Sequence, residues 1–288
     1  MTKHLSNMDR AEVLLQALPY IQKYVGKVVV IKYGGNAATD EHMREQVMED
    51  IVLLWAIGVK VVLVHGGGPE ISKMMEKMGK KSEFVDGLRV TDEETIDIVQ
   101  MVLSGKMNKN LVNLLAVKGG RAIGMSGTDG HLIEATFKDE RLGFVGDITN
   151  INIEPVEGLL EGNYIPVIST VGCDQEGNTY NINGDTAAAY IAGALNAERF
   201  ILMTNISGIM EDPEDPDSLI PELTVEEAKG LYDSGVISGG MIPKVDCCIS
   251  ATEMGVNGVV ILDGRVPHAI LMELLTDEGA GTRIRQSV

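Results

Sequence analysis

The sequence predicts an α/β fold, with an open, mainly parallel sheet, helices on both of its faces and a preceding N-terminal helix. Two observations predict the sheet: short β-branched runs have no polar interruption, and they alternate with longer amphipathic segments. This pattern is typical of parallel strands buried on both faces. A third observation is that capping patterns mark several helix starts. The expected strands cover residues 27–31, 60–64, 164–168, 200–203 and 258–262.

The expected helices follow from apolar residues that recur at helical spacing. The first lies within residues 1–26, the second follows Asp40, and a long third spans residues 96–114. The first helix carries four apolar residues on one stripe: Leu14, Leu18, Ile21 and Val25. Three capping-box patterns mark helix starts: Ser6-x-x-Asp9, Thr91-x-x-Glu94 and Thr224-x-x-Glu227.

Two further segments have a different pattern. Residues 131–153 and 172–182 are punctuated by Gly and Asp and contain short alternating runs, which predicts β-hairpins. The length of 288 residues allows one large domain or two modest ones. We expect a soft boundary near Gly177, with an N-lobe over residues 27–177 and a C-lobe over residues 178–288.

Composition limits the possible functions. The net charge of −18 disfavours nucleic acid as a ligand, although a few local cations could still hold a small anion. Cys173, Cys247 and Cys248 have no metal-ligand spacing, so we expect reduced thiols. The apolar runs are far shorter than the roughly 20 residues that span a bilayer, and the start does not resemble a signal peptide. We therefore expect a soluble, cytoplasmic protein.

Glycines follow two of the expected strands. Lys32 precedes Gly34 and Gly35, and three glycines separate His65 from Pro69. Glycines at the carboxyl end of a strand let backbone N–H groups approach phosphate oxygens, and the next helix adds positive potential. Either loop alone is more typical of an ordinary turn that needs glycine.

Several familiar sites are missing from the sequence. It contains no P-loop pattern and no Gly-x-Gly-x-x-Gly after a strand, and its His-Gly-Gly-Gly run has no Gly-x-Ser-x-Gly nucleophile to accompany it. No residues have zinc-ligand spacing. The acidic residues 211–217 lack the pattern of a calcium loop and predict a solvated loop. We expect no metal site built by the protein itself.

Two lysines and one carboxylate are candidates for phosphoryl transfer. Lys32 ends a strand beside glycines, Lys244 follows a Ser-Gly-Gly segment, and Asp185 stands at an expected helix start. In phosphoryl transfer the protein mostly positions the reactants and offsets charge on the transferred group. Taken singly, each of these residues is more often a surface charge or a helix cap.

In their order and spacing, the motifs resemble the amino acid kinase family, and within it the acetylglutamate kinases, over nearly the whole chain. They are Val30-Ile-Lys-Tyr-Gly-Gly-Asn36, Val64-His-Gly-Gly-Gly-Pro69, Phe84-Val-Asp-Gly-Leu-Arg-Val-Thr91, Asn181-Ile-Asn-Gly-Asp185, Gly239-Gly-Met-Ile-Pro-Lys244 and Asp263-Gly-Arg-Val-Pro-His268. The Gly-Leu-Arg-Val-Thr segment separates these kinases from aspartokinases and uridylate kinases better than the glycines do. The resemblance implies an eight-stranded sheet, with amino-acid binding and dimerisation in the N-lobe and ATP binding in the C-lobe.

The resemblance also implies the activity. ATP, with Mg²⁺ carried by the nucleotide, would phosphorylate the γ-carboxylate of N-acetyl-L-glutamate in the second step of arginine biosynthesis. A sister kinase of another blocked acidic substrate, such as carrier-linked α-aminoadipate, is the alternative within this class. A non-catalytic sensor would be expected to lose Lys32, Lys244 or Asp185, and all three are present.

The roles of individual residues are carried over from the same resemblance. Lys32 and Lys244 would stabilise the transferred phosphoryl group, and Asp185 would hold both lysines. Backbone donors would be Gly34 and Gly35 for the phosphates, and Gly67 and Gly68 for the substrate. Arg89 would clamp the α-carboxylate of the substrate, with Asn181 as a second contact. Asn205 stands where many members of the family have Asp, which leaves one carboxylate fewer near the lysines.

Arginine is expected as a feedback inhibitor. The N-terminal helix and the segment 268–279 resemble those of arginine-sensitive acetylglutamate kinases, in which such helices join three dimers into a hexamer. The implied effector residues are Tyr20, His268, Glu273 and Gly279. The alternative is that the apolar stripe of this helix packs on its own lobe.

Overall fold

The computed structural model describes residues 6–34, 40–212 and 215–287. Its main sheet has eight strands in the order β12-β14-β13-β11-β1-β2-β8-β5, and every neighbouring pair is parallel except β13 and β14. The predicted α/β class is confirmed, and all five predicted strands are present. The strands are β1 (Val28–Tyr33), β2 (Lys60–His65), β5 (Ala122–Ser126), β8 (Ile165–Ser169), β11 (Arg199–Thr204), β12 (Glu222–Thr224), β13 (Val259–Asp263) and β14 (Gly281–Arg285).

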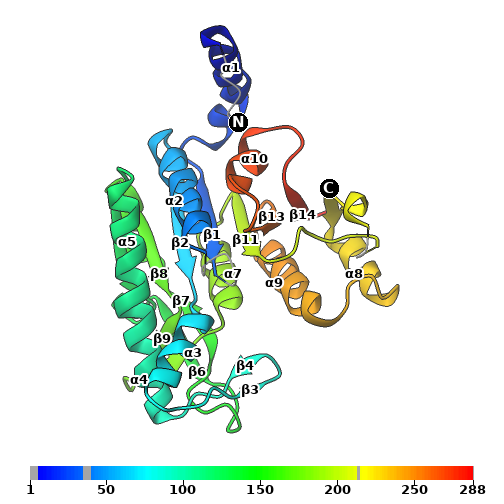
Figure 1. Ribbon diagram of the computed structural model, residues 1–288. Helices are drawn as coiled ribbons and strands as arrows, with labels where there is room; N and C mark the ends of the chain where they lie inside the picture. The colour runs from blue at the N-terminus through cyan, green and yellow to red at the C-terminus, as the bar shows by residue number, and fades with distance from the viewer. Residues whose placement is uncertain (1–5, 35–39, 213–214, 288) are drawn as a thin grey trace.

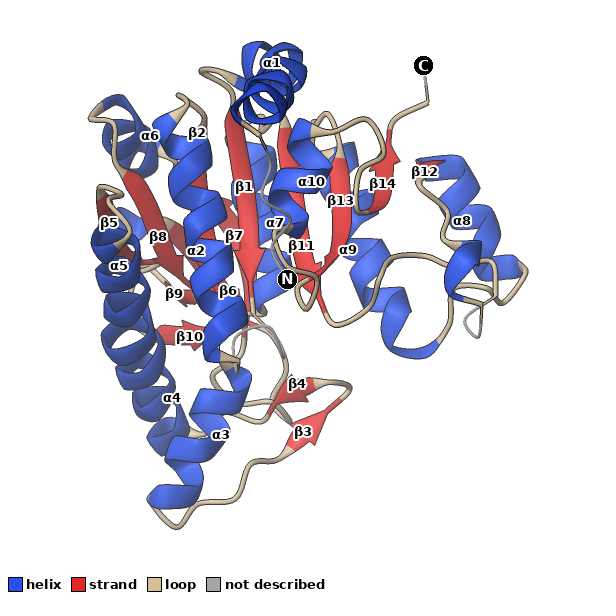
Figure 2. Ribbon diagram, turned by 45° about the horizontal axis from the view of Figure 1, so that its top comes forward, coloured by secondary structure: helices blue, strands red, loops and turns tan. Residues whose placement is uncertain are grey.

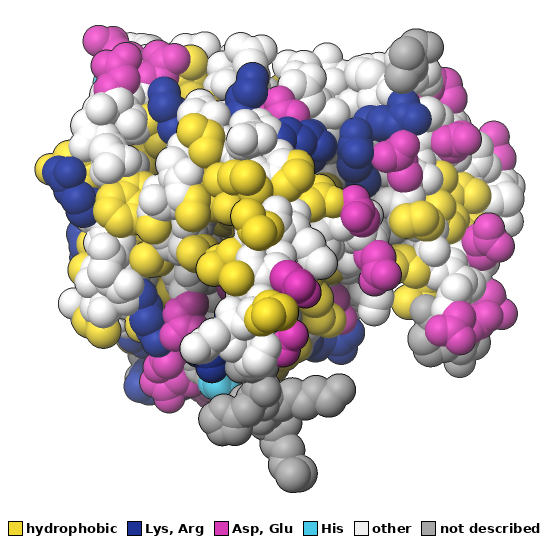
Figure 3. All heavy atoms as spheres, turned by 90° about the horizontal axis from the view of Figure 1, so that it is seen from above, with side chains coloured by type: hydrophobic (Ala, Val, Ile, Leu, Met, Phe, Trp, Pro, Cys, Tyr) yellow, Lys and Arg dark blue, Asp and Glu magenta, His cyan; other side chains and the backbone are white. Residues whose placement is uncertain are grey.

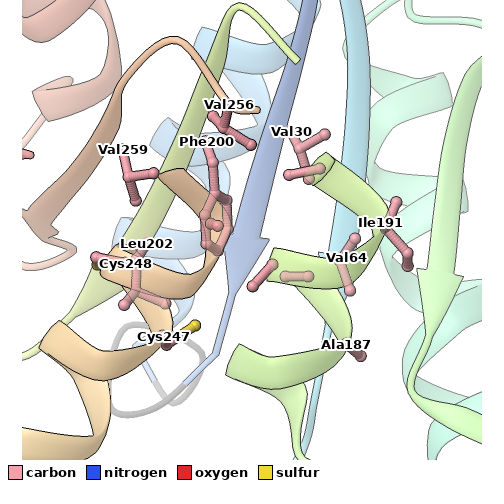
Figure 4. Close-up of a cluster of buried hydrophobic side chains, with 14 of the residues drawn as sticks. Val30, Val64, Ala187, Ile191, Phe200, Leu202, Cys247, Cys248, Val256 and Val259 are labelled. Atoms are coloured by element: carbon pink, nitrogen blue, oxygen red, sulfur yellow. The ribbon is translucent and has the colours of Figure 1, made fainter. Parts of the chain in front are cut away.

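Helices cover both faces of this sheet (Figures 1 and 2). Side chains alternate between the faces along each strand, so Val30 packs in one hydrophobic core and Val29 in the other. Figure 4 shows the first core, where Val30, Phe200 and Leu202 point toward two helices. That face carries α6 (Glu154–Glu161), α7 (Gly184–Ala194), α8 (Val225–Asp233) and α9 (Ile242–Glu253). The opposite face carries α2 (Glu41–Ala56), α5 (Asn108–Val117) and α10 (Ala269–Leu275).

The long third helix is present but contains a π-helical segment. It consists of α4 (Glu93–Gln100), η2 (Met101–Met107) and α5, and η2 is the π-helical part. The predicted capping box of Thr91 with Glu94 is wrong. Asp92 is the N-cap and accepts a hydrogen bond from Thr95 N, whereas the buried Thr91 hydroxyl donates to Arg89 O at 2.8 Å.

Smaller elements gather at the carboxyl ends of the parallel strands (Figure 1). A second sheet in the order β10-β9-β6-β7 contains both predicted hairpins. Its strands are β6 (Ile133–Phe137), β7 (Gly146–Ile151), β9 (Val171–Cys173) and β10 (Thr179–Asn181). The remaining elements are α3 (Gly68–Lys77), β3 (Phe84–Val85), β4 (Leu88–Arg89) and the 3₁₀ turns η3 (Asp129–His131), η4 (Pro216–Ser218) and η5 (Gly239–Met241).

The N-terminal helix α1 (Asn7–Tyr24) begins with the predicted capping box of Ser6 and Asp9. Its C-terminal end lies beside α10, and Tyr24 is its one buried residue. Much of its apolar stripe is exposed, with Leu14 70% and Leu18 44% accessible. Figure 3 looks down on this end of the molecule, where hydrophobic side chains gather at the centre of the view. Three of the four stripe residues, Leu14, Leu18 and Val25, are thus exposed, and Ile21 is partly buried.

No helix in the described part of the chain is long and apolar enough to cross a membrane. Two of the three predicted capping boxes are present, because Thr224 caps α8 together with Glu227 in the expected reciprocal way. The predicted boundary residue, Gly177, lies in the turn between β9 and β10 and has a φ of +91°.

Candidate active site

Lys32 and Lys244 meet at one carboxylate, as the sequence predicts. Lys32 lies near the end of β1 and Lys244 in the first turn of α9, far apart in the chain. Lys32 Nζ lies 2.7 Å from Asp185 Oδ1, and Lys244 Nζ lies 3.4 Å from Asp185 Oδ2. One carboxylate thus holds two ammonium groups side by side, an arrangement that can offset the charge of a phosphoryl group between them.

Local structure supports the ionised form of Asp185. It is the second residue of α7, where the helix dipole favours negative charge. Asn183 caps the same helix, because its Oδ1 accepts from the backbone N of Asp185 and of Thr186, each at 3.0 Å. Burial alone would raise the pKa of Asp185, but the charges and hydrogen bonds of Lys32 and Lys244 outweigh it and hold the pKa below its usual value.

Glycines leave room around the Lys32 side chain. A Cβ at Gly34 would lie 3.0 Å from Lys32 Nζ, and a Cβ at Gly184 would lie 3.6 Å from Lys32 Cε. The side chain of Lys32 therefore runs between two backbone segments that approach it closely. Gly35, the second predicted phosphate donor, lies outside the described residues.

Gly67 and Gly68 begin α3, and their positions differ. A Cβ at Gly67 would come within 2.2 Å of Met107 Sδ and 2.7 Å of Leu103 Cδ2, so the loop is pressed against η2. A Cβ at Gly68 would meet nothing within 4 Å. The glycine at position 67 is therefore required by close packing, whereas that at position 68 faces open space.

Arg89 is a buried cation with neutral partners. Its Nη1 donates to Ser82 Oγ at 2.7 Å, and its Nη2 donates to Ser72 Oγ and Gly68 O, both at 2.8 Å. The guanidinium also stacks on the Phe84 ring at 4.7 Å. Among the described residues, no carboxylate lies within salt-bridge distance of it. Desolvation lowers its pKa, so the site would gain from a bound anion.

One pocket of about 140 Å³ brings together the predicted substrate residues Gly67, Gly68, Arg89 and Asn181. Asn181 Nδ2 donates to Thr91 Oγ1 at 3.1 Å, and Thr91 in turn donates to Arg89 O. The buried hydroxyl of Thr91 thereby connects Asn181 with the backbone of Arg89.

A larger pocket of about 340 Å³ adjoins the first and shares part of its lining. Asp185 and Lys244 line it together with Thr186 and Gly240. A third, more apolar cavity of about 260 Å³ is lined by residues 205–210 and by Met241, the last residue of η5. The first two pockets adjoin, and η5 contributes Gly240 to the second pocket and Met241 to the third.

The comparisons with known proteins agree with this arrangement. A family model described as the amino acid kinase family matches residues 27–263. The chain belongs to the amino acid kinase family. It is 51% identical over 281 residues to an acetylglutamate kinase of Clostridioides difficile, covering 97% of this chain and 98% of that protein. It is 52% identical to an acetylglutamate kinase of Desulfitobacterium hafniense, covering 98% and 99% of the two chains.

Solved structures share the fold of this amino acid kinase. An N-acetylglutamate synthase of Neisseria gonorrhoeae, complexed with coenzyme A and N-acetyl-glutamate, superposes with a TM-score of 0.83 at 24% identity. That match covers 96% of this chain and 64% of the other. A carbamate kinase of Giardia lamblia bound to AMP-PNP has a TM-score of 0.62 at 18% identity, covering 91% and 99%.

Three of the four predicted effector residues line a separate pocket of about 250 Å³ between α1 and the segment after α10. They are Tyr20, Glu273 and Gly279. The Tyr20 hydroxyl donates to Asp277, and Glu273 Oε2 accepts from Ala280 N at 2.9 Å. His268 does not line this pocket.

His268 instead contacts α2. Its Nδ1 lies 2.6 Å from Oδ1 of the buried Asp50. Burial raises the pKa of Asp50 to about 6, despite the hydrogen bond from His268. The structure therefore separates His268 from the other three effector candidates.

No group of three His, Cys, Asp or Glu residues suited to a metal ion occurs in the described part of the chain. Asn205 lines the apolar cavity and not the pocket of the paired lysines.

Some site residues were not predicted from the sequence. Thr91 was interpreted as a helix cap, yet it connects Arg89 to Asn181. Ser72 and Ser82 orient Arg89 from a helix and from the loop after it, and no motif marks either residue. For Asn183 a signal existed, because the Asn-x-Asn-x-Asp pattern precedes α7.

Proposed function

We propose that this protein transfers the γ-phosphoryl group of ATP to the γ-carboxylate of N-acetyl-L-glutamate. The observation that carries the proposal is Arg89: a buried guanidinium without a carboxylate partner among the described residues faces a small pocket. A planar guanidinium suits a carboxylate. The pocket volume of about 140 Å³ suits an amino-acid-sized molecule. The identity of the acetylated substrate is proposed from the names of the full-length relatives, which are acetylglutamate kinases.

In the proposed mechanism, Arg89 and Asn181 hold the α-carboxylate and the amide of the substrate. The γ-carboxylate then lies beside Gly67 and Gly68, whose backbone N–H groups offset its charge. Lys32 and Lys244 stabilise the phosphoryl group as it passes from ADP to the carboxylate oxygen, because their interaction strengthens as charge shifts onto it. The product is an acyl phosphate.

ATP would occupy the two remaining pockets. Its phosphates fit beside Lys244 and Thr186, and its base fits the apolar cavity at Asn205 and Met241. Mg²⁺ enters with the nucleotide as part of the substrate and supplies charge neutralisation between the phosphates. We propose that the N-lobe, residues 27–177, provides the acid site and that the C-lobe, residues 178–288, provides the nucleotide site, acting in the cytoplasm.

The test is a substrate comparison with purified enzyme. ADP release and hydroxamate formation, which reports an acyl phosphate, are measured with ATP and N-acetyl-L-glutamate, glutamate, N-acetyl-aspartate or a carrier-linked α-aminoadipate. We expect N-acetyl-L-glutamate to have the highest kcat/KM. A clear preference for the carrier-linked substrate would contradict the proposal and favour the sister kinase.

We further propose that arginine inhibits the enzyme by binding at Tyr20, Glu273 and Gly279, and that α1 joins dimers into a hexamer. The support is twofold: the effector pocket takes one wall from α1, and the apolar stripe of α1 is exposed. Glu273 and Asp277 offer carboxylates for a guanidinium. A ligand in this pocket contacts both α1 and the main body, so it can change the position of α1.

A further inference from the structure

Behind the glycine loop lies a buried polar pair that has no direct role in the proposed mechanism. His65 is the last residue of β2, and Asn108 is the first residue of α5; both are fully buried. His65 Nε2 lies 3.2 Å from Asn108 Nδ2. Asn108 Nδ2 also lies 2.8 Å from Val167 O and 3.2 Å from Met125 O, both of which can accept from it. Burying such groups is costly unless they are hydrogen-bonded, so this cluster needs an explanation.

The contacts assign one tautomer to His65. Lys109 Nζ can only donate, and it lies 3.1 Å from Asn108 Oδ1, which orients the Nδ2 end of the amide toward His65. Nδ2 has two hydrogens for three neighbours: one goes to Val167 O, and the other is shared between Met125 O and Nε2 of His65, which therefore accepts. Burial lowers the pKa of His65 to about 4, and a neutral imidazole then carries its proton on Nδ1. That nitrogen lies 3.2 Å from Gly66 O, a group that can only accept.

The hydrogen bond to Gly66 O fixes a peptide plane of the glycine loop. The C=O of Gly66 and the N–H of Gly67 belong to one trans peptide, so they point in opposite directions. With the carbonyl turned toward the buried ring of His65, the N–H of Gly67 turns away from it. Gly66 and Gly67 both line the acid pocket, and no acceptor among the described residues bonds to the N–H of Gly67.

The π-helical segment supports the same peptide from a second direction. Leu103 and Met107 of η2 press against the Cα of Gly67, and Asn108 follows η2 directly. A π-helical turn changes the register of the residues after it, and such turns are frequent at functional sites. Packing and hydrogen bonding therefore converge on the peptide between Gly66 and Gly67.

We propose that His65, oriented by Asn108, is a positioning residue that presents the N–H of Gly67 to the reacting oxygen. Its Nδ1–H holds the carbonyl of Gly66, and the preorganised N–H of Gly67 stabilises charge during phosphoryl transfer. The inference rests on the proposed function. The proposed role of His65 is to orient a donor. Loss of this role should therefore lower kcat and leave the binding of N-acetyl-L-glutamate nearly unchanged.

Two substitutions separate the two contacts of the His65 ring. The amide of His65→Asn can occupy the position of Nδ1 and donate to Gly66 O, but it cannot reach Asn108. The amide of His65→Gln can occupy the position of Nε2 and accept from Asn108, but it cannot donate to Gly66 O. Both variants remove the ring, so their loss of packing is similar, and thermal unfolding checks that both are folded.

The kinetic assay compares these variants with wild type. We expect His65→Gln to lower kcat roughly tenfold or more with little change in KM, since a small misalignment of a donor is costly. His65→Asn should recover most of kcat. Equal losses of kcat in both variants, or losses that follow thermal stability alone, would overturn the proposal. A wild-type enzyme inactive on N-acetyl-L-glutamate would instead overturn the proposed function.

A measurement on the wild-type protein does not depend on the variants or on activity. ¹⁵N-labelled histidine reports the tautomer of each of the five rings by NMR. We expect one ring to remain neutral with its proton on Nδ1 from pH 5 to pH 8, a range above the pKa of about 4 for His65. The absence of such a ring, or a ring at His65 with its proton on Nε2, would overturn the assignment.

Discussion

Lys32 and Arg89 are cations at nearly dry positions, and their neighbours decide what each can do. Lys32 is neutralised by Asp185, so it is fixed in place before any substrate arrives. Arg89 has neutral partners and no carboxylate within reach in the described part of the chain, so it is suited to receive an external anion. At the residue scale, the two cations thus have different expected roles, in catalysis and in substrate binding.

Lys32→Ala and Lys244→Ala should each lower kcat far more than they raise either KM. Loss of one charge that stabilises the transition state costs roughly 3–4 kcal/mol. Steady-state kinetics with ATP and N-acetyl-L-glutamate give both constants. Lys229→Ala is the matched control, because Lys229 pairs with Glu253 on the surface, and it should leave kcat unchanged. Near-normal kcat in either site variant would remove that lysine from the mechanism.

Arg89→Lys should raise KM for N-acetyl-L-glutamate roughly tenfold or more, which corresponds to about 1.4 kcal/mol. The reason is that a planar fork becomes a single point charge. KM for ATP should barely change. Arg141→Lys serves as the control, since Arg141 is bound to Asp139 at an exposed position. A rise in KM for ATP alone would assign Arg89 to the nucleotide site.

At the scale of elements, contacts between helices hold the site and shape the stability of the protein. The π-helical η2 presses on the glycine loop, and α2 meets α10 through a buried carboxylate and a histidine. Both contacts join segments that are distant in sequence. Each contact can be tested through the change in stability when one side is substituted.

Gly67→Ala should destabilise the protein by about 1–3 kcal/mol, because a methyl group there overlaps Met107 and Leu103. Met107→Ala in the same chain should relieve part of the clash, so the double variant should be less destabilised than the sum of the single variants. Urea unfolding measures all three. Gly68→Ala is the stability control, since it meets open space. Strict additivity would contradict the packing argument.

Asp50→Asn should stabilise the protein at neutral pH. Burial raises the pKa of Asp50 to about 6, above the ordinary value of 3.8 for this carboxyl group. Because the folded protein holds the Asp50 proton more tightly than the unfolded chain, the protonated carboxyl contributes stability that is fully present below about pH 4. This contribution is lost as the pH rises through about 6. The variant does not ionise there, so its advantage over wild type should grow across this window, by up to about 3 kcal/mol.

Unfolding free energies at pH 4.5 and pH 7.5 test this prediction for Asp50→Asn. Glu49→Gln on the same helix is the control. Glu49 is exposed and paired with Lys118, and its pKa is lowered, so its substitution should change stability little and in the opposite direction. An advantage of Asp50→Asn that is equal at both pH values would show that the carboxyl group does not titrate as inferred.

At the scale of the whole molecule, one eight-stranded sheet runs through both predicted lobes. The lysine pair joins β1 near the middle of the sheet to α9, and the substrate pocket lies at the carboxyl ends of the strands. The helix α1 lies at the opposite end, with an exposed apolar stripe (Figures 1 and 3).

Removing residues 1–25 should reduce both assembly and arginine sensitivity. We expect the full chain to sediment as a hexamer that millimolar arginine inhibits, and the chain beginning at Gly26 to form dimers that arginine affects much less. Tyr20→Phe separates the two effects, since it removes only the hydroxyl bonded to Asp277. It should stay hexameric with weaker inhibition. A full-length dimer insensitive to arginine would contradict this regulation and leave the kinase assignment intact.

The sequence alone determined much of the fold and part of the site. Unbroken β-branched runs and capping boxes are local signals, so the predicted parallel strands, both hairpins and two helix caps are present. Resemblance to the family identified Lys32, Lys244, Asp185, Arg89 and Asn181 together. The structure brings the first three into contact and the last two into one pocket.

Only the tertiary structure decided the remaining features. Thr91 carries the same capping pattern as Ser6 and Thr224, but its hydroxyl donates to the nearby Arg89 O and accepts from Asn181, which is 90 positions away. His268 contacts Asp50 and not the effector pocket. The buried ring of His65 meets Asn108, 43 positions away, at 3.2 Å. In each case the deciding partner is distant in sequence, and a local pattern carries no information on which distant group will satisfy a buried hydrogen bond.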